Sequence, residues 1–281
     1  MANNPRDKRT QAIVLKRTNY GEADRILQLL TPEGKKSVIA RGVRKEKSKL
    51  AGGIELFSVS DVMIHEGRGE LGILTSARLA EHFDALVSDL DLIERAGVML
   101  REVNQRAEQI DSPEFFNILH QALRAMQTHH AEEGRWRDVL RAWWSLNLAR
   151  IAGEEVNLRF DNVGEKLLVE EYYHWDQESM ALAKHPSGQI GADHIKLMRV
   201  MVSTPIEVTL KVRGADVLID EVIYVAKCIE RAKKWIKVIT QKALNIDEIE
   251  VMNKRILKSA IIVSMEEYDY FIGGFKGGLR A

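Results

Sequence analysis

Five short apolar runs, separated by turn-forming residues, occupy residues 11–79 and constrain the fold of this chain more than any other feature. Glycine, proline and asparagine between the runs supply the backbone angles that tight turns require. Short apolar runs with this punctuation are typical of strands rather than helices. We therefore predict five strands that close into a small barrel. The runs are centred on residues 12–15, 26–30, 38–40, 56–64 and 73–74.

The oligonucleotide-binding (OB) barrel is the common five-stranded closed fold, and its ligand face lies on the second and third strands and the loops beside them. Charge indicates what such a face could bind. The whole chain has 41 basic and 41 acidic residues, yet residues 1–50 hold 13 bases and 5 acids, a net charge of +8 that the remainder balances with −8. The densest basic run, residues 35–49, covers the predicted third strand and the following loop. Binding of a polyanion through counterion release is the functional prediction.

A basic groove for single strands also needs an aromatic surface on which bases can stack. Tyr20, in the predicted first loop, is the candidate, whereas Phe57 is predicted inside a strand and in the core. Glu22 and Asp24 are interpreted as ion-pair and loop-ordering groups. The alternative for the whole basic run is a solvated face that keeps the chain soluble. The predicted DNA-binding cations are Arg17, Arg25, Lys35, Lys36, Arg41, Arg44, Lys45, Lys47, Lys49 and Arg68.

Several spaced strings in this stretch carry a family resemblance. They are Ala-Ile-Val-Leu-Lys-Arg-Thr-Asn-Tyr-Gly-Glu-Ala-Asp-Arg-Ile-Leu at 12–27, Thr-Pro-Glu-Gly at 31–34, Ile-Ala-Arg-Gly-Val-Arg-Lys-Glu-Lys-Ser at 39–48, Glu-Leu-Phe at 55–57 and Glu-Gly-Arg-Gly at 66–69. The region resembles the amino-terminal domain of the RecO family of bacterial recombination mediators. The resemblance implies an OB domain and a helical domain that bind single- and double-stranded DNA and anneal complementary strands. It also implies action with RecR and the single-strand-binding protein (SSB) to load the RecA recombinase.

The pattern changes near Arg78 from short apolar runs to helical spacing. The fold class predicted is therefore α+β and multidomain, with a small irregular or β insertion in the helical part. We expect an OB domain over 1–79 and a helical domain over 80–245 with a cysteine-free insertion near 157–190. The extension 246–281 is read as a flexible tail, with an accessory nucleic-acid contact through Phe275, Lys276 and Arg280 as the alternative. Helices are predicted over 80–107, from 114, over 136–152, 192–202 and 216–244, and a hairpin over 167–182.

The predicted helix over 136–152 carries two adjacent tryptophans, Trp143 and Trp144. Adjacent positions on a helix face different directions, so at least one is expected in the core while the other could line a groove. By the resemblance, the helical domain of the family receives the acidic, phenylalanine-terminated tail of SSB in an apolar pocket flanked by bases. Arg141 is then the candidate for the tail carboxylate, because a guanidinium matches a carboxylate fork.

The sequence gives little support for a metal site or for catalysis. Many members of the family carry four cysteines in a zinc-binding insertion, but this chain has a single cysteine, Cys228, which rules out a cysteine-based zinc site and an internal disulfide framework. The spacings of His174, His185 and His194 fit no compact metal motif, although a site with Asp176 or Asp193 stays open. The glycines at 67–72 have dinucleotide-fingerprint spacing but lie between two predicted strands. We expect no metal, no cofactor and no catalysis.

The first ten residues are polar and basic and lack an apolar signal core, and no apolar run is long enough to span a membrane. The expected location is the cytoplasm, with association to the nucleoid during repair. Two alternatives to a mediator remain open. One is an OB-type single-stranded DNA or RNA binder that ignores SSB and RecR. The other is a protein-interaction adaptor whose basic face meets an acidic partner.

Overall fold

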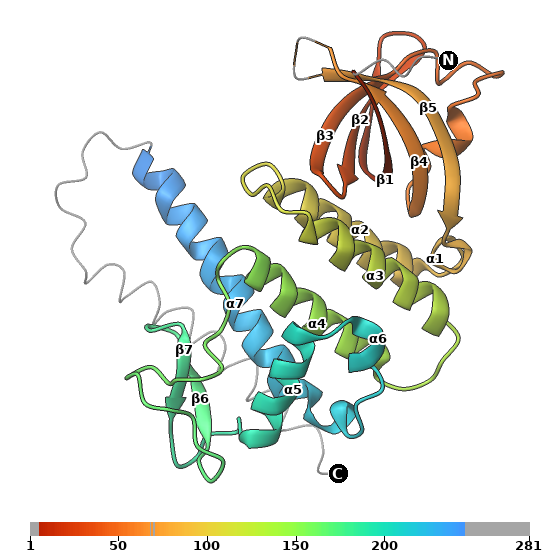
Figure 1. The fold of residues 1–281 in the computed structure, drawn as a ribbon. Helices are drawn as coiled ribbons and strands as arrows, with labels where there is room; N and C mark the ends of the chain where they lie inside the picture. Colours follow the sequence, from red (N-terminus) through yellow and green to blue (C-terminus); the bar gives the residue numbers. More distant parts are fainter. Residues whose placement is uncertain (1–5, 68, 70, 245–281) are drawn as a thin grey trace, which may run out of the picture. The chain divides into compact units, whose positions relative to one another are not determined.

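The computed structural model describes residues 6–67, 69 and 71–244, with side chains as far as Arg231. The chain forms a closed barrel of five strands, followed by helices and a small hairpin (Figure 1). The order around the barrel is β1-β2-β3-β5-β4, in which β3 and β5 are parallel and the other pairs are antiparallel. The predicted OB barrel and the α+β class are confirmed. The strands are β1 (Asp7–Tyr20), β2 (Asp24–Thr31), β3 (Gly34–Ala40), β4 (Ser58–His65) and β5 (Leu71–His82).

Strand β1 is long enough to pair with β4 along its first half and with β2 along its second half. The register with β2 shifts between Val14 and Lys16, which marks a β-bulge. Side chains alternate between the two faces of a strand, and a bulge resets that alternation. Val14 therefore points into the barrel interior. Arg17 is opposite Leu27, whose side chain also points into the interior, whereas Lys16 points to the outside.

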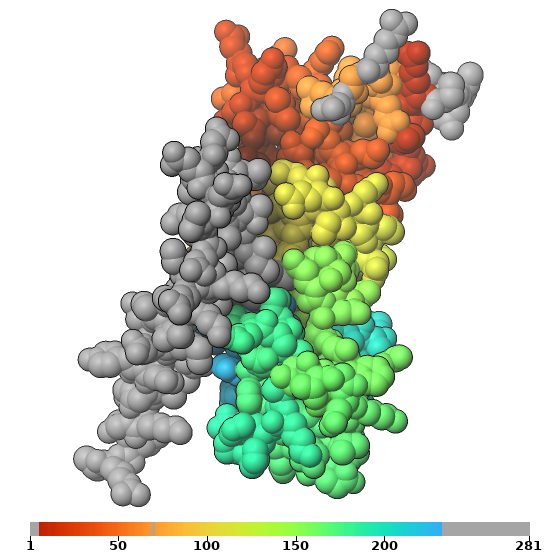
Figure 2. Space-filling model, turned by 90° about the vertical axis from the view of Figure 1, so that its left-hand side faces the viewer, coloured from red at the N-terminus to blue at the C-terminus, as the bar shows by residue number. Residues whose placement is uncertain are grey.

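The inside and the outside of the barrel wall belong to two different apolar cores. Ala12, Val14 and other small or branched residues fill its interior. Ile13, Leu15 and Leu30, on the outside, pack into the core of the helices. The view in Figure 2 shows the barrel (red to orange) in contact with the yellow segment that contains α2. Part of the outer barrel surface is thus covered by protein and cannot serve a ligand.

The junction between strands and helices differs from the prediction. Strand β5 continues to His82, which pairs with Ser58, and the predicted helix over 80–107 is two helices. They are α1 (Asp84–Ser88) and α2 (Leu90–Arg106), and the break falls at Asp89. The Asp89 carboxylate accepts hydrogen bonds from the backbone nitrogens of Asp91 and Leu92, an N-cap that starts a new helix.

Phe57 is buried, as expected, but it lies outside any strand. Its φ of 57° is unusual for a bulky residue, and the turn it makes precedes β4. A single 3₁₀ turn, η1 (Ala51–Gly53), lies earlier in the same connection. The predicted strand over 56–64 therefore begins only at Ser58.

The remaining helices are α3 (Glu114–His129), α4 (Trp136–Ile151), α5 (Ala192–Ser203), α6 (Ile206–Thr209) and α7 (Ala215–Leu244). All were predicted except α6. The hairpin, β6 (Tyr173–Asp176) and β7 (Ala181–Lys184), lies inside the predicted insertion but begins later than residue 167. At the start of α3 the Ser112 hydroxyl accepts a hydrogen bond from the nitrogen of Glu114 at 3.3 Å.

Residues 1–232 form one compact unit and residues 233–281 a second. The domain boundaries expected at 79 and 245 stay predictions. The extension 246–281, with Phe275, Lys276 and Arg280, lies outside the described residues. Among the helices that are described, none combines the length and apolar content that a membrane crossing requires.

Candidate nucleic-acid interface

Three polar side chains lie in one row on the outside of the barrel, one from each of its first three strands. Lys16 of β1 is opposite Gln28 of β2, which is opposite Ser37 of β3. The Ser37 hydroxyl donates to Gln28 Oε1 at 2.8 Å. Their neighbours Leu27 and Val38 point into the barrel interior, so this row faces outward. We call these three residues the outer row.

An aliphatic row follows directly beside the outer row. Thr18 is opposite Ile26, Ile26 is opposite Ile39, and Ile39 pairs with Ile73 of β5. The three isoleucines are half-buried. The outer surface of β2 and β3, which is the usual ligand face of an OB barrel, thus offers apolar contact next to hydrogen-bonding groups.

The loop after β3 folds back onto the turn between β1 and β2. The Asp24 carboxylate accepts a hydrogen bond from the nitrogen of Gly42 at 2.7 Å. Arg44 donates to Ala23 O through its backbone at 2.9 Å and to Gly21 O through its guanidinium at 3.2 Å. The loop-ordering role predicted for Asp24 is confirmed, and the contacts bring the basic loop after β3 next to the turn that lies between Tyr20 and Arg25.

This contact creates a basic rim beside Tyr20, whose side chain is 55% exposed at the end of β1. Within the part of the chain that the structure describes, no carboxylate forms an ion pair with any rim side chain. Arg25 is half-buried and donates to Asn19 Oδ1 at 3.2 Å, and the other members are exposed. The basic rim consists of Arg25, Arg41, Arg44, Lys45, Lys47 and Lys49.

Two predicted cations lie elsewhere. Arg17 donates to Glu55 Oε2 at 2.8 Å and Arg25 donates to Asn19 Oδ1. In the described residues neither arginine forms an ion pair with Glu22 or Asp24, so the interpretation of these two carboxylates as ion-pair groups is wrong. Lys35 donates to Asn104 O at 3.0 Å and to Glu108 Oε1 at 2.9 Å.

The physical reason for the position of Lys35 is that its side chain points to the outer surface that α2 covers, and only 10% of it is exposed. Arg17 points to the interior end of the barrel because the bulge places it opposite Leu27. Arg68 lies outside the described residues. Neither Arg17 nor Lys35 is therefore part of the open face.

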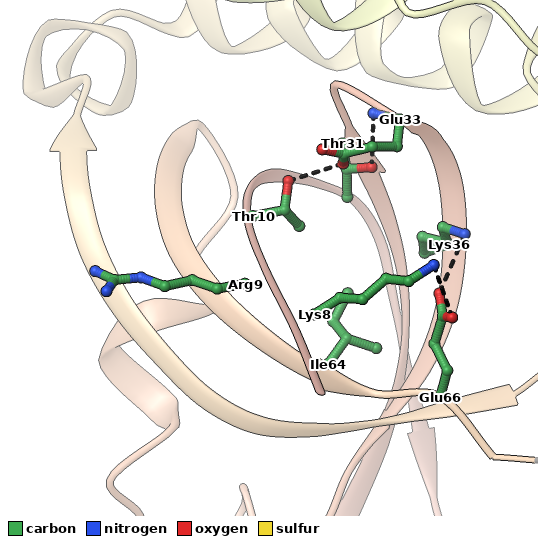
Figure 3. Close-up of a pocket in the computed structure, with 8 residues that line it drawn as sticks. All are labelled: Lys8, Arg9, Thr10, Thr31, Glu33, Lys36, Ile64 and Glu66. Atoms are coloured by element: carbon green, nitrogen blue, oxygen red, sulfur yellow. Dashed lines mark hydrogen bonds and ion pairs between the residues drawn. The ribbon is translucent and has the colours of Figure 1, made fainter. Parts of the chain in front are cut away.

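Lys36 lies in a hollow of about 220 Å³ at one opening of the barrel (Figure 3). There it pairs with Glu66 Oε1 at 3.4 Å, while Lys8 pairs with Glu66 Oε2 at 2.8 Å. The hydrogen bond from Lys8 and the charge of Lys36 hold the pKa of Glu66 below its ordinary value. The hollow is lined by Lys8, Arg9, Thr10, Thr31, Glu33, Lys36, Ile64 and Glu66.

Comparison with known proteins identifies the barrel. The family described as "Recombination protein O N terminal" matches residues 6–83, which is the five-stranded barrel from end to end. A DNA repair protein RecO of Roseiflexus sp. is 40% identical over 119 residues, 42% of each chain. A DNA repair protein RecO of Dehalococcoides mccartyi is 31% identical over 172 residues, 60% of this chain and 66% of that protein. The chain belongs to the RecO family.

The chain spans about two fifths of the Roseiflexus RecO protein, and 41% of a second relative, the DNA repair protein RecO of Heliobacterium modesticaldum, at 39% identity. The family match ends one residue beyond β5 and covers the outer row, the basic rim and the hollow. The candidate interface therefore lies entirely in the part that identifies the chain as a RecO family member.

The tryptophans proposed for a RecO-family tail site are both buried, at 1% and 3% exposure. Trp143 donates to Thr204 O at 3.0 Å, and Trp144 donates to Glu102 Oε2 at 2.7 Å. They face different neighbours, as adjacent helical positions must, but α4 has protein on both of these sides. The expectation that one of them lines an open groove is therefore wrong, whereas Arg141 is exposed.

No group of three or more His, Cys, Asp or Glu side chains that could hold a metal ion occurs in the described residues. The rings of His174 and His185 lie edge to face with centroids 4.9 Å apart. Cys228 is buried in α7, and burial raises the pKa of its thiol.

Sequence reasoning missed Lys16 and Lys8 of the RecO barrel, and also Arg9, which lines the hollow beside Lys8. Lys16 lies in the outer row, and a period-two pattern that ignores the bulge places it inside. Lys8 lies in the hollow, in the polar beginning of β1 that precedes the apolar run at 12–15. The sequence signal for these residues was their membership of the basic first fifty residues.

Proposed function

We propose that this chain is a non-enzymatic mediator of DNA repair and homologous recombination. It binds single- and double-stranded DNA, anneals complementary strands and helps RecA load onto single strands coated with SSB. RecR, the SSB tail and RecA are its proposed partners, and the nucleoid is its proposed place of action. The observation that carries the proposal is the basic rim, whose side chains form no ion pair with a carboxylate in the described part of the chain, beside the aliphatic row and Tyr20 on a barrel shared with proteins named DNA repair protein RecO.

The basic rim would neutralise backbone phosphates and release their counterions, with a salt dependence of roughly 0.7 to 0.9 per phosphate on a logarithmic scale. Tyr20 is the residue on which a base would stack, and the isoleucine row supplies further apolar contact. Contacts of this kind read no base sequence. Annealing follows because two screened strands can approach each other while base pairing supplies the specificity.

Arg141 is proposed to bind the carboxylate end of the SSB tail. Its side chain is exposed on α4, one turn after Arg137, which pairs with Asp89 and Asp91. A guanidinium binds a carboxylate in a two-pronged geometry that lysine cannot reproduce. The buried Trp143 and Trp144 would support this surface from below rather than contact the tail.

The test is annealing of two complementary labelled oligonucleotides, each precoated with SSB, without ATP. Acceleration by this protein would support both DNA binding and tolerance of SSB. Binding to naked strands without acceleration would overturn the mediator proposal in favour of a simple OB binder. Absence of binding to any polynucleotide at low salt would favour the adaptor instead.

A matched pair of variants tests whether the basic rim binds the DNA. Replacing Arg44, Lys45, Lys47 and Lys49 with alanine should slow annealing and flatten the salt dependence of binding. The control removes four exposed cations from the helical part, Lys166, Lys211, Arg213 and Lys227, and therefore changes the net charge equally. Equal losses in both variants would show that total charge, rather than the basic rim, controls binding.

A further inference from the structure

One carboxylate connects two lysines from different strands at the opening of the barrel. Glu66 directs one oxygen at Lys8 of β1, at 2.8 Å, and the other at Lys36 of β3, at 3.4 Å. All three side chains remain accessible: the exposed fraction is 36% for Glu66, 58% for Lys8 and 37% for Lys36. Figure 3 shows them converging on one side of the hollow, while Thr10, Thr31 and Glu33 gather on the other.

Two ammonium groups that face one carboxylate could also bind the oxygens of a phosphate. The two Glu66 oxygens, each facing an ammonium group, stand in for two non-bridging oxygens of a phosphodiester. The hollow of about 220 Å³ is several times larger than the roughly 30 Å³ that one water takes up in the liquid, so a phosphodiester has room to enter. The competing carboxylate, Glu33, is held aside by the Thr10 hydroxyl at 2.8 Å.

The position of Glu66 also allows a nucleic-acid strand to displace its carboxylate from the two lysines. It directly follows β4 at the start of the connection to β5, one of the loops that flank the ligand face of an OB barrel. Its backbone nitrogen donates to Arg6 O at 2.9 Å, so the backbone is held. Rotation of the side chain alone would leave Lys8 and Lys36 open.

We propose that Lys8 and Lys36 form a subsite for a backbone phosphate of a nucleic acid, and that Glu66 occupies this subsite when no strand is bound. The proposal rests on the proposed DNA binding of the barrel and adds an internal competitor to it. Glu66 lowers the affinity for a strand and returns to the lysines when the strand leaves. An annealing protein needs such release, because both strands must depart as a duplex.

The test measures binding of a fluorescent oligothymidylate by anisotropy as a function of salt. Glu66→Gln should raise affinity at low salt by about three- to tenfold and steepen the logarithmic salt slope by about one, as expected when further phosphates are neutralised. Asp61→Asn is the matched control. It removes one negative charge from β4, the strand that directly precedes Glu66, where Asp61 pairs with Arg78 at 3.1 Å, and it should change neither quantity as much.

Two further variants distinguish the release of Lys8 and Lys36 from Glu66 from a mere change in net charge. Glu66→Asp keeps the charge but is one methylene shorter and cannot reach both lysines, so it should also raise affinity. Lys8→Gln should cancel the gain in the Glu66→Gln background and have little effect alone. Circular dichroism and thermal unfolding report whether each variant is folded.

The outcomes distinguish the two proposals. If the unaltered protein binds no oligothymidylate, the proposed function itself fails. If it binds but Glu66→Gln behaves like Asp61→Asn, the competitor role of Glu66 is overturned while the proposed function stands. A gain that survives Lys8→Gln would also overturn the subsite.

Discussion

Lys35 Nζ lies 2.9 Å from Glu108 Oε1, and this ion pair joins the start of β3 to the segment after α2. The same ammonium donates to Asn104 O at 3.0 Å. A lysine from the most basic run of the chain therefore holds the barrel against the helices. Its neighbour Lys36 points to the opposite face of β3 and lines the hollow.

Lys35→Ala should lower the free energy of unfolding by about 1–2 kcal/mol, because two charge-assisted hydrogen bonds are lost from a nearly buried group. Urea unfolding measures this. Lys47→Ala, at an exposed position, is the control and should leave stability unchanged while reducing the salt slope of DNA binding. The interpretation fails if Lys35→Ala reduces the slope as much as Lys47→Ala and leaves stability intact.

Glu81 makes a second link between barrel and helices, through His120 Nε2 at 2.7 Å and Arg124 Nε at 2.8 Å of α3. Burial raises the pKa of Glu81, but the hydrogen bonds from Arg124 and His120 outweigh it, so the pKa in the folded protein is lowered. The stabilisation is therefore present at neutral pH and is lost as pH falls below the ordinary range of a glutamate and through the lowered value.

The Glu81→Gln variant checks this dependence by urea unfolding across pH. It should be less stable than the unaltered protein by about 1 kcal/mol at pH 7, the scale of one charge-assisted hydrogen bond. The difference should shrink in acid, where Glu81 of the unaltered protein becomes protonated. A difference that is constant from pH 7 to pH 3 would contradict the assigned role.

Gly53, in the turn η1, packs directly against the backbone of β5. A Cβ at this position would lie 2.5 Å from the carbonyl carbon of Ala77. Gly53→Ala should therefore destabilise the barrel by about 1–3 kcal/mol, the usual cost of overpacking. Gly52→Ala is a neighbouring control, because a Cβ there meets nothing within 4 Å. Equal melting temperatures for the two variants would disprove the close packing.

Arg141→Glu should weaken binding of a peptide that carries the SSB tail by about tenfold or more, as expected when an attractive charge-assisted contact becomes repulsive. Arg213→Glu makes the same charge change at another exposed position and is the control. Fluorescence titration of the labelled peptide measures both. Unchanged affinity in Arg141→Glu would move the tail site away from this part of α4.

Much of the fold could be predicted because its signals are local. The run at 12–15 and the turn residues after it specify a strand through neighbouring positions alone, and Ser112 and Pro113 mark the start of α3 in the same way. The end of β5 could not be predicted, since pairing of His82 with Ser58 extends the strand into residues whose pattern favours a helix. The split at Asp89 depends on a single capping side chain.

By itself, the sequence determined that a five-stranded barrel with a basic surface precedes a set of helices, because apolar spacing, turn residues and charge are properties of short segments. The tertiary structure decided which cations remain open. A bulge after Val14 turns Lys16 outward and Arg17 inward, and α2 covers Lys35. Packing on both sides of α4 buries both tryptophans. These outcomes depend on register and on surfaces that meet from distant parts of the chain, which no local pattern records.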